Sequence, residues 1–373
     1  MKNQHDIKVC VVIPCFNEAK NIIAVCKSLG FGMGKTKIKN NDTLFIVDNN
    51  STDNTYEILK EIRKNSRTGA VFIGKETVQG FIPARERGNL MVVEFCKRKH
   101  LVPQNILIVQ ADADTIYSKG YLAAMKKESL TSGENTMLQA CISYLPSFRA
   151  KYSKYLQMCE RIDNRYSSLF PSQLDDDIII DDKVAAYRLS DYFKWGGFIR
   201  EYTSRGDEIY SETSRLFIRS KIKNAKRRMV DTFAFHSARK IVANPLLSLA
   251  TAGFPHERLN LEQLKIIYED NPSLDLGNFN MKNPKIKKAA KQRELHILTL
   301  LTILPYHVAA TLDKKTRIIP SQFAAFLRTI LPTRKKADLK NRPGVFFIDA
   351  VDVMINFPEE IFNQANQLLQ RGN

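Results

Sequence analysis

The chain alternates apolar, strand-like runs with helical segments over residues 7–150, and this alternation limits the folds available to it. Strands that alternate with helices need crossover connections, which place the strands side by side in a mostly parallel sheet. We therefore predict an α/β fold with a Rossmann-type sheet flanked by helices. The predicted strands lie near 8–14, 43–48, 70–74, 105–110 and 137–143, and the predicted helices near 18–29, 54–65, 82–98 and 118–130.

Three of these strand-like runs end on acidic or amide residues. Asn17 follows the first run, Asp48 ends the second, and Asp112 and Asp114 follow the fourth. Ligands of an open parallel sheet bind at the carboxyl ends of its strands, so neighbouring strands would direct these side chains into one crevice. The set suggests a site for a nucleotide and a metal ion.

Asp112-Ala113-Asp114 is a D-x-D sequence placed directly after a buried strand. Carboxylate oxygens of this kind hold Mg²⁺ or Mn²⁺ while substrate phosphates complete the coordination shell. The alternative is a solvated turn, because turns often carry acidic pairs. The carboxylate of Asp48 can accept hydrogen bonds from a base or a ribose hydroxyl, whereas Asp53 fits better as the cap of the helix that follows.

Two later segments carry further candidates. Gly206-Asp207-Glu208 precedes an amphipathic helix; one of its carboxylates could act as a general base, or both could be ordinary acids at a helix N-terminus. His236 could be a third protein ligand of the metal, or a packed or exposed polar residue. Arg239 could hold a diphosphate in a bidentate manner, or be one more surface charge.

The composition narrows the class of protein. A net charge of +18 favours anionic partners such as nucleotides, phospholipid headgroups or nucleic acid. The six cysteines form no Cys-x-x-Cys pair, which indicates a reducing compartment without disulfides or a zinc site. The first residues are not typical of a signal peptide. The longest later apolar stretch, 296–312, is broken by Pro305 and His307 and is shorter than the roughly 20 residues of a spanning helix.

These motifs, taken in order, resemble those of a bacterial-type family 2 glycosyltransferase of the GT-A fold. The resemblance covers about residues 8–240. Glu86 stands where the family usually has Asn, and the acids at 207 and 208 are exchanged relative to the family's Glu-Asp pair. The matching segments are the opening strand at 12–18, the nucleotide-binding turn at 47–53, the segment from Gly80 to Gly88, the metal motif at 112–114, the acceptor-side segment at 186–198, the base motif at 206–208 and a basic segment at 237–240.

The resemblance implies a metal-dependent, inverting transfer, here of a hexose, from a nucleotide sugar, most simply a UDP-sugar, to a hydroxyl of a glycan or a lipid-linked acceptor. It assigns Asp112, Asp114 and His236 to Mn²⁺ or Mg²⁺, and the base to Glu208 or Asp207, with Glu208 favoured. The residues assigned to the nucleotide sugar are Pro14, Phe16, Asn17, Glu18, Asp48, Asn50, Gly80, Arg85, Asp112 and Arg239.

Other classes remain open at this point. A catalytically inactive sugar-nucleotide binder would share the same motifs. A nucleotidyltransferase also uses paired aspartates, but usually carries a Gly-rich loop near the first strand. A nucleic-acid-binding protein is disfavoured, because the basic runs contain few aromatic residues.

The sequence predicts a catalytic domain over 1–245 and a helical, basic region over 246–373. Basic runs at 219–228, 282–293 and 334–342, beside amphipathic helices, fit peripheral contact with an anionic membrane. A solvated basic surface on a helical subdomain is the alternative. We predict a cytoplasmic protein, with the inner face of the membrane as its place of attachment in the first case.

Overall fold

The computed structural model describes residues 7–32, 41–166, 177–252, 276–313 and 319–371. The chain divides into two compact units, and each unit is assembled from separate stretches. A domain boundary near 245 stays a prediction, because the units interleave along the sequence. Unit 1 is Met1–Tyr144, Ile180–Ile199 and Glu212–Ser237, and unit 2 is Leu145–Ile179, Arg200–Ser211 and Ala238–Asn373.

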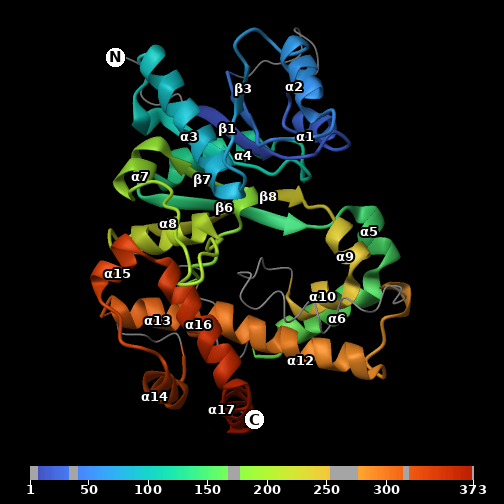
Figure 1. Ribbon diagram of the computed structural model, residues 1–373, viewed down its shortest axis with the longest axis vertical. Coiled ribbons are helices and arrows are strands. Elements are labelled where there is room, and N and C mark those ends of the chain that lie inside the picture. Colours follow the sequence, from blue (N-terminus) through green and yellow to red (C-terminus); the bar gives the residue numbers. More distant parts are fainter. Residues whose placement is uncertain (1–6, 33–40, 167–176, 253–275, 314–318, 372–373) are drawn as a thin grey trace. The chain divides into compact units, whose positions relative to one another are not determined.

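Unit 1 is built on an eight-stranded sheet with the order β3-β2-β1-β4-β7-β6-β8-β5. The pairs β1–β2, β1–β4, β2–β3 and β6–β8 are parallel, and only β7 and β5 run against the rest. The predicted mostly parallel α/β sheet with flanking helices is therefore confirmed (Figure 1). The strands are β1 (Lys8–Cys15), β2 (Thr43–Asp48), β3 (Val71–Lys75), β4 (Ile106–Gln110), β5 (Ile116–Tyr117), β6 (Thr136–Ser143), β7 (Ala185–Arg188) and β8 (Lys226–Phe235).

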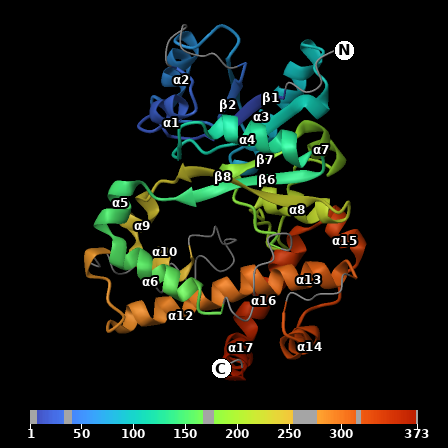
Figure 2. The same cartoon turned by 180° about the vertical axis from the view of Figure 1, so that it is seen from behind.

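Helices cover the two faces of this sheet (Figure 1 and, from behind, Figure 2). The helices predicted near 18–29, 54–65, 82–98 and 118–130 lie close to these positions, whereas the helix at 189–194, the short strands β5 and β7 and the strand β8 were not predicted. The helices of unit 1 are α1 (Ile22–Ser28), α2 (Thr55–Lys64), α3 (Phe81–Arg98), α4 (Tyr121–Ser132), α7 (Leu189–Lys194) and α8 (Glu212–Lys221), with short 3₁₀ turns η1 (Pro103–Asn105) and η2 (Asp182–Val184).

The two-residue period of β1 explains how both faces are filled. Val9, Val11 and Ile13 belong to the core cluster that also contains apolar residues of α1, α2 and α4. Val12 points to the opposite face, where α3 packs against β1. A Cβ atom on Gly88 of α3 would lie 2.3 Å from Val12 Cγ1, so only glycine allows this close approach.

Unit 2 is helical. A cluster of buried residues from α12, α13, α14, α16 and α17 forms its core, which confirms the helical character predicted for the C-terminal region. Its helices are α5 (Pro146–Lys151), α6 (Ser153–Asp163), α9 (Arg239–Ala243), α10 (Pro245–Ala250), α12 (Pro284–Leu298), α13 (Leu304–Thr311), α14 (Ser321–Ile330), α15 (Lys336–Asn341), α16 (Gly344–Asn356) and α17 (Pro358–Arg371), with a 3₁₀ turn η3 (Leu276–Asn278) and a π-helical turn η4 (Thr299–Ile303).

The apolar stretch that contains Pro305 and His307 is interrupted as its sequence suggests. Proline lacks the N–H that would continue the helical hydrogen bonds, and the wider π turn η4 directly precedes it. The imidazole of His307 is buried, and its Nε2 lies 2.7 Å from Asp349 Oδ2. No helix in the described part of the chain is long and apolar enough to cross a membrane.

Candidate functional site

The carboxyl ends of three adjacent strands bring the predicted residues Asn17, Asp48 and Asp112 to one edge of the sheet. Strand β1 lies between β2 and β4, so the predicted adjacency is confirmed. Cys15 is level with Asp48, and Val12 is level with Gln110. Asn17 and Asp112 therefore each lie two residues beyond the end of their own strand.

Asn17 and Asn50 shape the loops at this edge. Both have positive φ angles, 53° and 62°, a conformation that asparagine tolerates better than most residues. Asn17 Oδ1 accepts a hydrogen bond from the Thr52 N–H at 2.8 Å, and Asn50 Nδ2 donates to the Thr77 carbonyl at 2.8 Å. These side chains join the loops after β1 and β2 and the loop after β3 into one rim.

The start of α3 is fixed from the same rim. The N–H of Gly80 donates to Asn49 Oδ1 at 2.9 Å, and Gly80 has a φ of 142° that suits glycine. Of the other predicted nucleotide contacts, Glu18 binds Asn21 Nδ2 at 2.6 Å, Pro14 is half-buried and Phe16 is exposed. These contacts give Glu18 a structural role, whereas Phe16 presents an aromatic ring at the edge.

The carboxylate of Asp48 has one buried oxygen, Oδ1, without a hydrogen-bond partner among the described residues. The side chain as a whole is 5% exposed. Buried polar atoms of proteins are almost always hydrogen-bonded, so an unpaired one needs an explanation. A hydroxyl or amine of a bound ligand would satisfy this oxygen, as the nucleoside prediction for Asp48 requires.

Arg85 is the buried cation of this edge. Its side chain is 3% exposed; Nη2 donates to Asp112 Oδ1 at 2.5 Å, and Nη1 donates to Gln110 Oε1 at 3.2 Å. Nε lies 2.9 Å from Glu212 Oε1 as an ion pair, although the two atoms are not aligned as a hydrogen bond. Gln110 in turn donates to Asn89 and to Tyr187 at 2.9 and 2.8 Å, so Arg85 has little freedom to move.

Glu212 and Asp182 are acidic residues of this site that the sequence did not reveal. Burial, and then the carboxylate of Asp182, raises the pKa of Glu212 to about 7, against the opposing effect of Arg85. Burial likewise raises the pKa of Asp182, which accepts the Thr213 N–H at 3.2 Å. The two carboxyls interact, so the proton that they retain near neutral pH belongs to the pair.

Lys183 and Asp181 were also missed, although the acidic run at 181–182 was visible. Lys183 Nζ donates to Asp181 Oδ1 and Oδ2 at 2.7 and 2.6 Å. The carbonyl of Lys183 accepts the Tyr117 hydroxyl at 3.0 Å, and that hydroxyl oxygen accepts the Asp112 N–H at 2.9 Å. One tyrosine therefore ties the turn η2 to the D-x-D sequence.

His236 follows β8 and lies within electrostatic reach of the D-x-D residues. Burial, and then the Lys183 cation, lowers the pKa of His236 to about 4, while Asp181, Asp114 and Asp112 oppose the shift. Its ring centroid lies 4.2 Å from that of Tyr144. His236 is therefore a neutral imidazole at neutral pH, which is the form that binds metals.

The donor set fits a divalent cation in part. Carboxylates and a neutral imidazole are suitable ligands for Mn²⁺, and Mg²⁺ is commonly held by one or two carboxylates plus substrate phosphates. Within the described residues, no three His, Cys, Asp or Glu side chains stand together as a preformed metal site. Asp112 and Asp114 could thus hold an ion only together with other ligands, such as phosphate oxygens.

The predicted base residues lie in unit 2. Glu208 Oε1 is bound by Arg200 Nε at 2.5 Å, and residue 208 also forms a β-bridge with Tyr202. The N–H of Asp207 donates to Thr203 Oγ1 at 3.2 Å, and we find no contact of its carboxylate among the described residues. Glu201, in the same segment, accepts the Gly344 N–H at the start of α16 at 2.7 Å, which anchors this loop within unit 2. Arg239 is exposed in the first turn of α9.

The basic runs are used in two different ways. Arg219, Lys221 and Arg227 are buried in unit 1, and Arg293 of unit 2 is bound by both oxygens of Asp163. These charged side chains are therefore buried within their units and do not form a basic surface. The lysines of α12 and of the turn before it are exposed instead, namely Lys282, Lys285, Lys287, Lys288 and Lys291.

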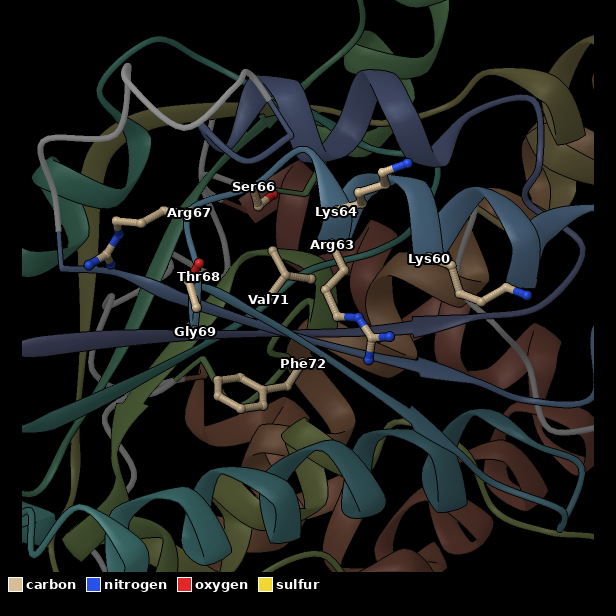
Figure 3. A pocket seen from close by; sticks show the side chains of 9 residues that line it. All are labelled: Lys60, Arg63, Lys64, Ser66, Arg67, Thr68, Gly69, Val71 and Phe72. Carbon is tan, nitrogen blue, oxygen red and sulfur yellow. The ribbon is translucent and has the colours of Figure 1, made fainter.

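A pocket of about 610 Å³ lies elsewhere in unit 1, around the end of α2 and the amino end of β3. Figure 3 shows that its basic side chains diverge: Arg63 extends toward Phe72, whereas Lys60, Lys64 and Arg67 point in different directions. Because β3 is parallel to β2, this pocket lies at the amino ends of the strands. It is not the site predicted from Asp48 and Asp112.

Comparison with known proteins agrees with the motifs at the strand ends. Residues 10–163 match the model of glycosyl transferase family 2. A protein of Methanocaldococcus jannaschii, described as uncharacterized protein MJ0544, is 32% identical over 91 residues. That alignment covers 24% of this chain and 36% of the relative, so it spans about a third of the relative's length.

Solved structures show a distant likeness over most of the chain. TarS 1–349 of S. aureus in complex with UDP-GlcNAc is 13% identical, with a TM-score of 0.45, over 93% of this chain and 91% of that one. The mannosyltransferase PcManGT of Pyrobaculum calidifontis, in complex with GDP-Man and Mn²⁺, is 14% identical with a TM-score of 0.45, over 95% and 91%.

Proposed function

We propose that the protein transfers a sugar, most simply a hexose, from a nucleotide-sugar donor to a hydroxyl of a glycan or lipid-linked acceptor, in keeping with the match of residues 10–163 to the model of glycosyl transferase family 2. The single observation that carries this proposal is the edge of the sheet in unit 1. There the unsatisfied Oδ1 of Asp48 and the D-x-D residues Asp112 and Asp114 follow adjacent parallel strands. Such an edge offers a nucleoside and its diphosphate separate places.

Asp48 would accept a hydrogen bond from the nucleoside. Asp112 keeps its Oδ1 on Arg85, so its other oxygen and the carboxylate of Asp114 would hold Mn²⁺ or Mg²⁺, with His236 as a further ligand. The bound cation would neutralise the charge of the departing diphosphate. Arg85, locked by Gln110 and Glu212, would keep Asp112 in position for that role.

The transfer would be inverting and would need one carboxylate as a base. The acceptor oxygen would attack the anomeric carbon, its proton would pass to the carboxylate, and the bond from that carbon to the diphosphate oxygen would break. Glu208 and Asp207 are the candidates. Glu208 would have to exchange Arg200 for an acceptor hydroxyl, whereas no described contact holds the Asp207 carboxylate; this difference supports Asp207 over the Glu208 that the sequence favoured.

The exposed lysines of α12 support a second part of the proposal, peripheral contact with an anionic membrane at its cytoplasmic face. Each Lys near such a surface contributes about 1 kcal/mol. A lipid-linked acceptor would be reached from there. The exposed lysines of the run 334–342, namely Lys335, Lys336 and Lys340, would add to this contact, whereas Arg219 and Arg227 are buried and would not.

The test uses purified full-length protein with Mn²⁺ and a panel of sugar nucleotides, UDP-sugars first. Wild-type protein is expected to bind and slowly hydrolyse at least one donor. Asp114→Asn should remove the Mn²⁺-dependent part of binding, and Asp48→Asn should weaken binding of the nucleoside itself. Asp231→Asn, a change of an exposed aspartate on β8, is the control. Donor binding with the same Mn²⁺ dependence in Asp114→Asn would exclude the assignment, and binding without any turnover would favour an inactive sugar-nucleotide binder.

A further inference from the structure

The side chain of Lys183 carries an ammonium group close to the D-x-D sequence, and the proposed transfer does not yet use it. It lies in the turn η2, just before β7, and its side chain is 20% exposed. The tyrosine that accepts the Asp112 N–H donates to the carbonyl of Lys183. The backbone of Lys183 is thus two hydrogen bonds away from the backbone of Asp112.

The electrostatic surroundings keep this ammonium charged. Burial acts to lower the pKa of Lys183, but the carboxylates of Asp181, Asp112 and Asp182 outweigh it and raise the pKa above its ordinary value. Lys183 also acts on His236, so it lies among the groups expected to surround the phosphates. A lysine here is a permanent point charge at neutral pH.

The two cations of this edge differ in what they can reach. Arg85 is 3% exposed, and Asp112, Gln110 and Glu212 already occupy it. Lys183 has three N–H donors, and Nζ directs hydrogen bonds only to the two oxygens of Asp181 among the described residues. Lys183 thus has a donor to spare, and Asp181 holds its ammonium in place.

We propose that Lys183 binds the diphosphate of the donor and makes the site selective for nucleoside diphosphates over monophosphates. This proposal rests on the proposed function and adds to it the residue that recognises the diphosphate. Asp181 is a positioning residue, which keeps the ammonium at the D-x-D edge. Ammonium groups are common phosphate ligands and act as point charges.

The experiment measures dissociation constants of UDP and UMP, and of GDP and GMP, for the full-length protein with Mn²⁺ by titration calorimetry. Lys183→Met should weaken diphosphate binding roughly 10- to 100-fold, the usual effect of one charged hydrogen bond. Monophosphate binding should change by less than about 3-fold, because UMP and GMP lack the second phosphate that Lys183 is proposed to bind. Lys183→Arg should keep most of the diphosphate affinity.

Two further variants separate binding from structure. Lys97→Met removes an exposed lysine in the last turn of α3 and should change no affinity. Asp181→Asn keeps the ammonium and an amide oxygen that can still hold it, so it should retain most of the UDP affinity of wild type. If Lys183 only stabilised the turn, Asp181→Asn and Lys183→Met would have the same effect, and both would weaken UDP and UMP alike.

The outcomes remain distinguishable from failure of the proposed function. Wild-type protein that binds no nucleoside diphosphate with Mn²⁺ would overturn the glycosyltransferase proposal and this inference together. Wild-type protein that binds diphosphates, with equal UDP to UMP ratios in wild type and Lys183→Met, would overturn the role of Lys183 alone.

Discussion

Glu212 should make the stability of the protein depend on pH in a way that a single substitution removes. Burial and the carboxylate of Asp182 raise the pKa of Glu212 from 4.5 to about 7 on folding. For an acid with a raised pKa, the folded state binds more protons than the unfolded state between these two values. The free energy of unfolding therefore falls as the pH rises from 4.5 to 7, by about 3 kcal/mol in total.

Glu212→Gln keeps the shape of the side chain and cannot ionise. Its free energy of unfolding should be close to that of wild type at pH 5 and should exceed it by up to about 3 kcal/mol at pH 8. Part of this gain is offset because Arg85 loses an anionic partner. Urea unfolding followed by circular dichroism, without added metal, at four pH values from 5 to 8, measures the difference.

The control is Glu57→Gln in the first turn of α2, where the glutamate side chain is 66% exposed and pairs with Lys60. It should follow the wild-type pH dependence, because exposed ion pairs contribute little. Parallel curves for wild type and Glu212→Gln across this range would refute the reasoning. The buried pair of carboxyls would then be ionised throughout, or Arg85 would fully compensate for the burial of Glu212.

Three further predictions follow from other parts of the structure. The base is tested by turnover at saturating donor: Asp207→Asn should lower the rate roughly 10²- to 10⁴-fold and Glu208→Gln by less, and the reverse result would restore Glu208. In unit 2, Arg293→Met should lower the free energy of unfolding by about 2 kcal/mol because it removes two charged hydrogen bonds to Asp163. Lys291→Met, which removes an exposed pair with Glu359, should cost less than about 0.5 kcal/mol; equal losses would contradict the importance of burial. In sedimentation assays the protein should bind anionic but not neutral vesicles at low salt and be released at high salt, and no binding at low salt would leave the lysines of α12 as a solvated surface.

The strands and their ends could be predicted because the signals are local. An apolar run followed by Asp48, or by Asp112, predicts both the strand and the position of the carboxylate from a few residues of sequence. The same holds for the helices between the strands, where the change of period from two to about four residues is visible. The alternation of strands and helices predicts a parallel sheet but not the order of its strands, so the adjacency of β1 and β4 was an assumption that the structure bears out.

The buried charge network could not be predicted, because its members are distant in sequence. Arg85, Asp182 and Glu212 come from three different elements, and each has an ordinary local explanation. Glu212 reads as an acid in the first turn of a helix, and Asp182 as part of a solvated acidic run. Gln110 was the missed signal: a polar residue at the end of a strand whose five positions are all buried requires buried partners.

Some basic residues that the sequence suggested would lie at the surface are also buried. A stretch such as 219–228 looks like a charged surface, but Arg219 donates to the Gly196 carbonyl at 3.3 Å, and a neighbour, Arg215, donates to that of Ile199 at 2.9 Å. Long basic side chains can cover apolar surface and place their donors on buried carbonyls. The net charge of the chain therefore does not predict which of its surfaces are basic.

The local charge at the sheet edge is opposite in sign to that of the whole chain, and this contrast bears on the proposed chemistry. A chain of net charge +18 attracts anions at long range, but the edge itself would repel a diphosphate. The shared proton of Asp182 and Glu212 removes one negative charge, and Arg85 and Lys183 offset two more. A negative excess remains, to which the carboxylate of Asp48 adds, and one divalent cation would offset most of it. We therefore expect the affinity for nucleoside diphosphates to depend on Mn²⁺ far more steeply than the affinity for the nucleoside alone. The interacting carboxyls among the described residues of this edge are Asp112, Asp114, Asp181, Asp182 and Glu212.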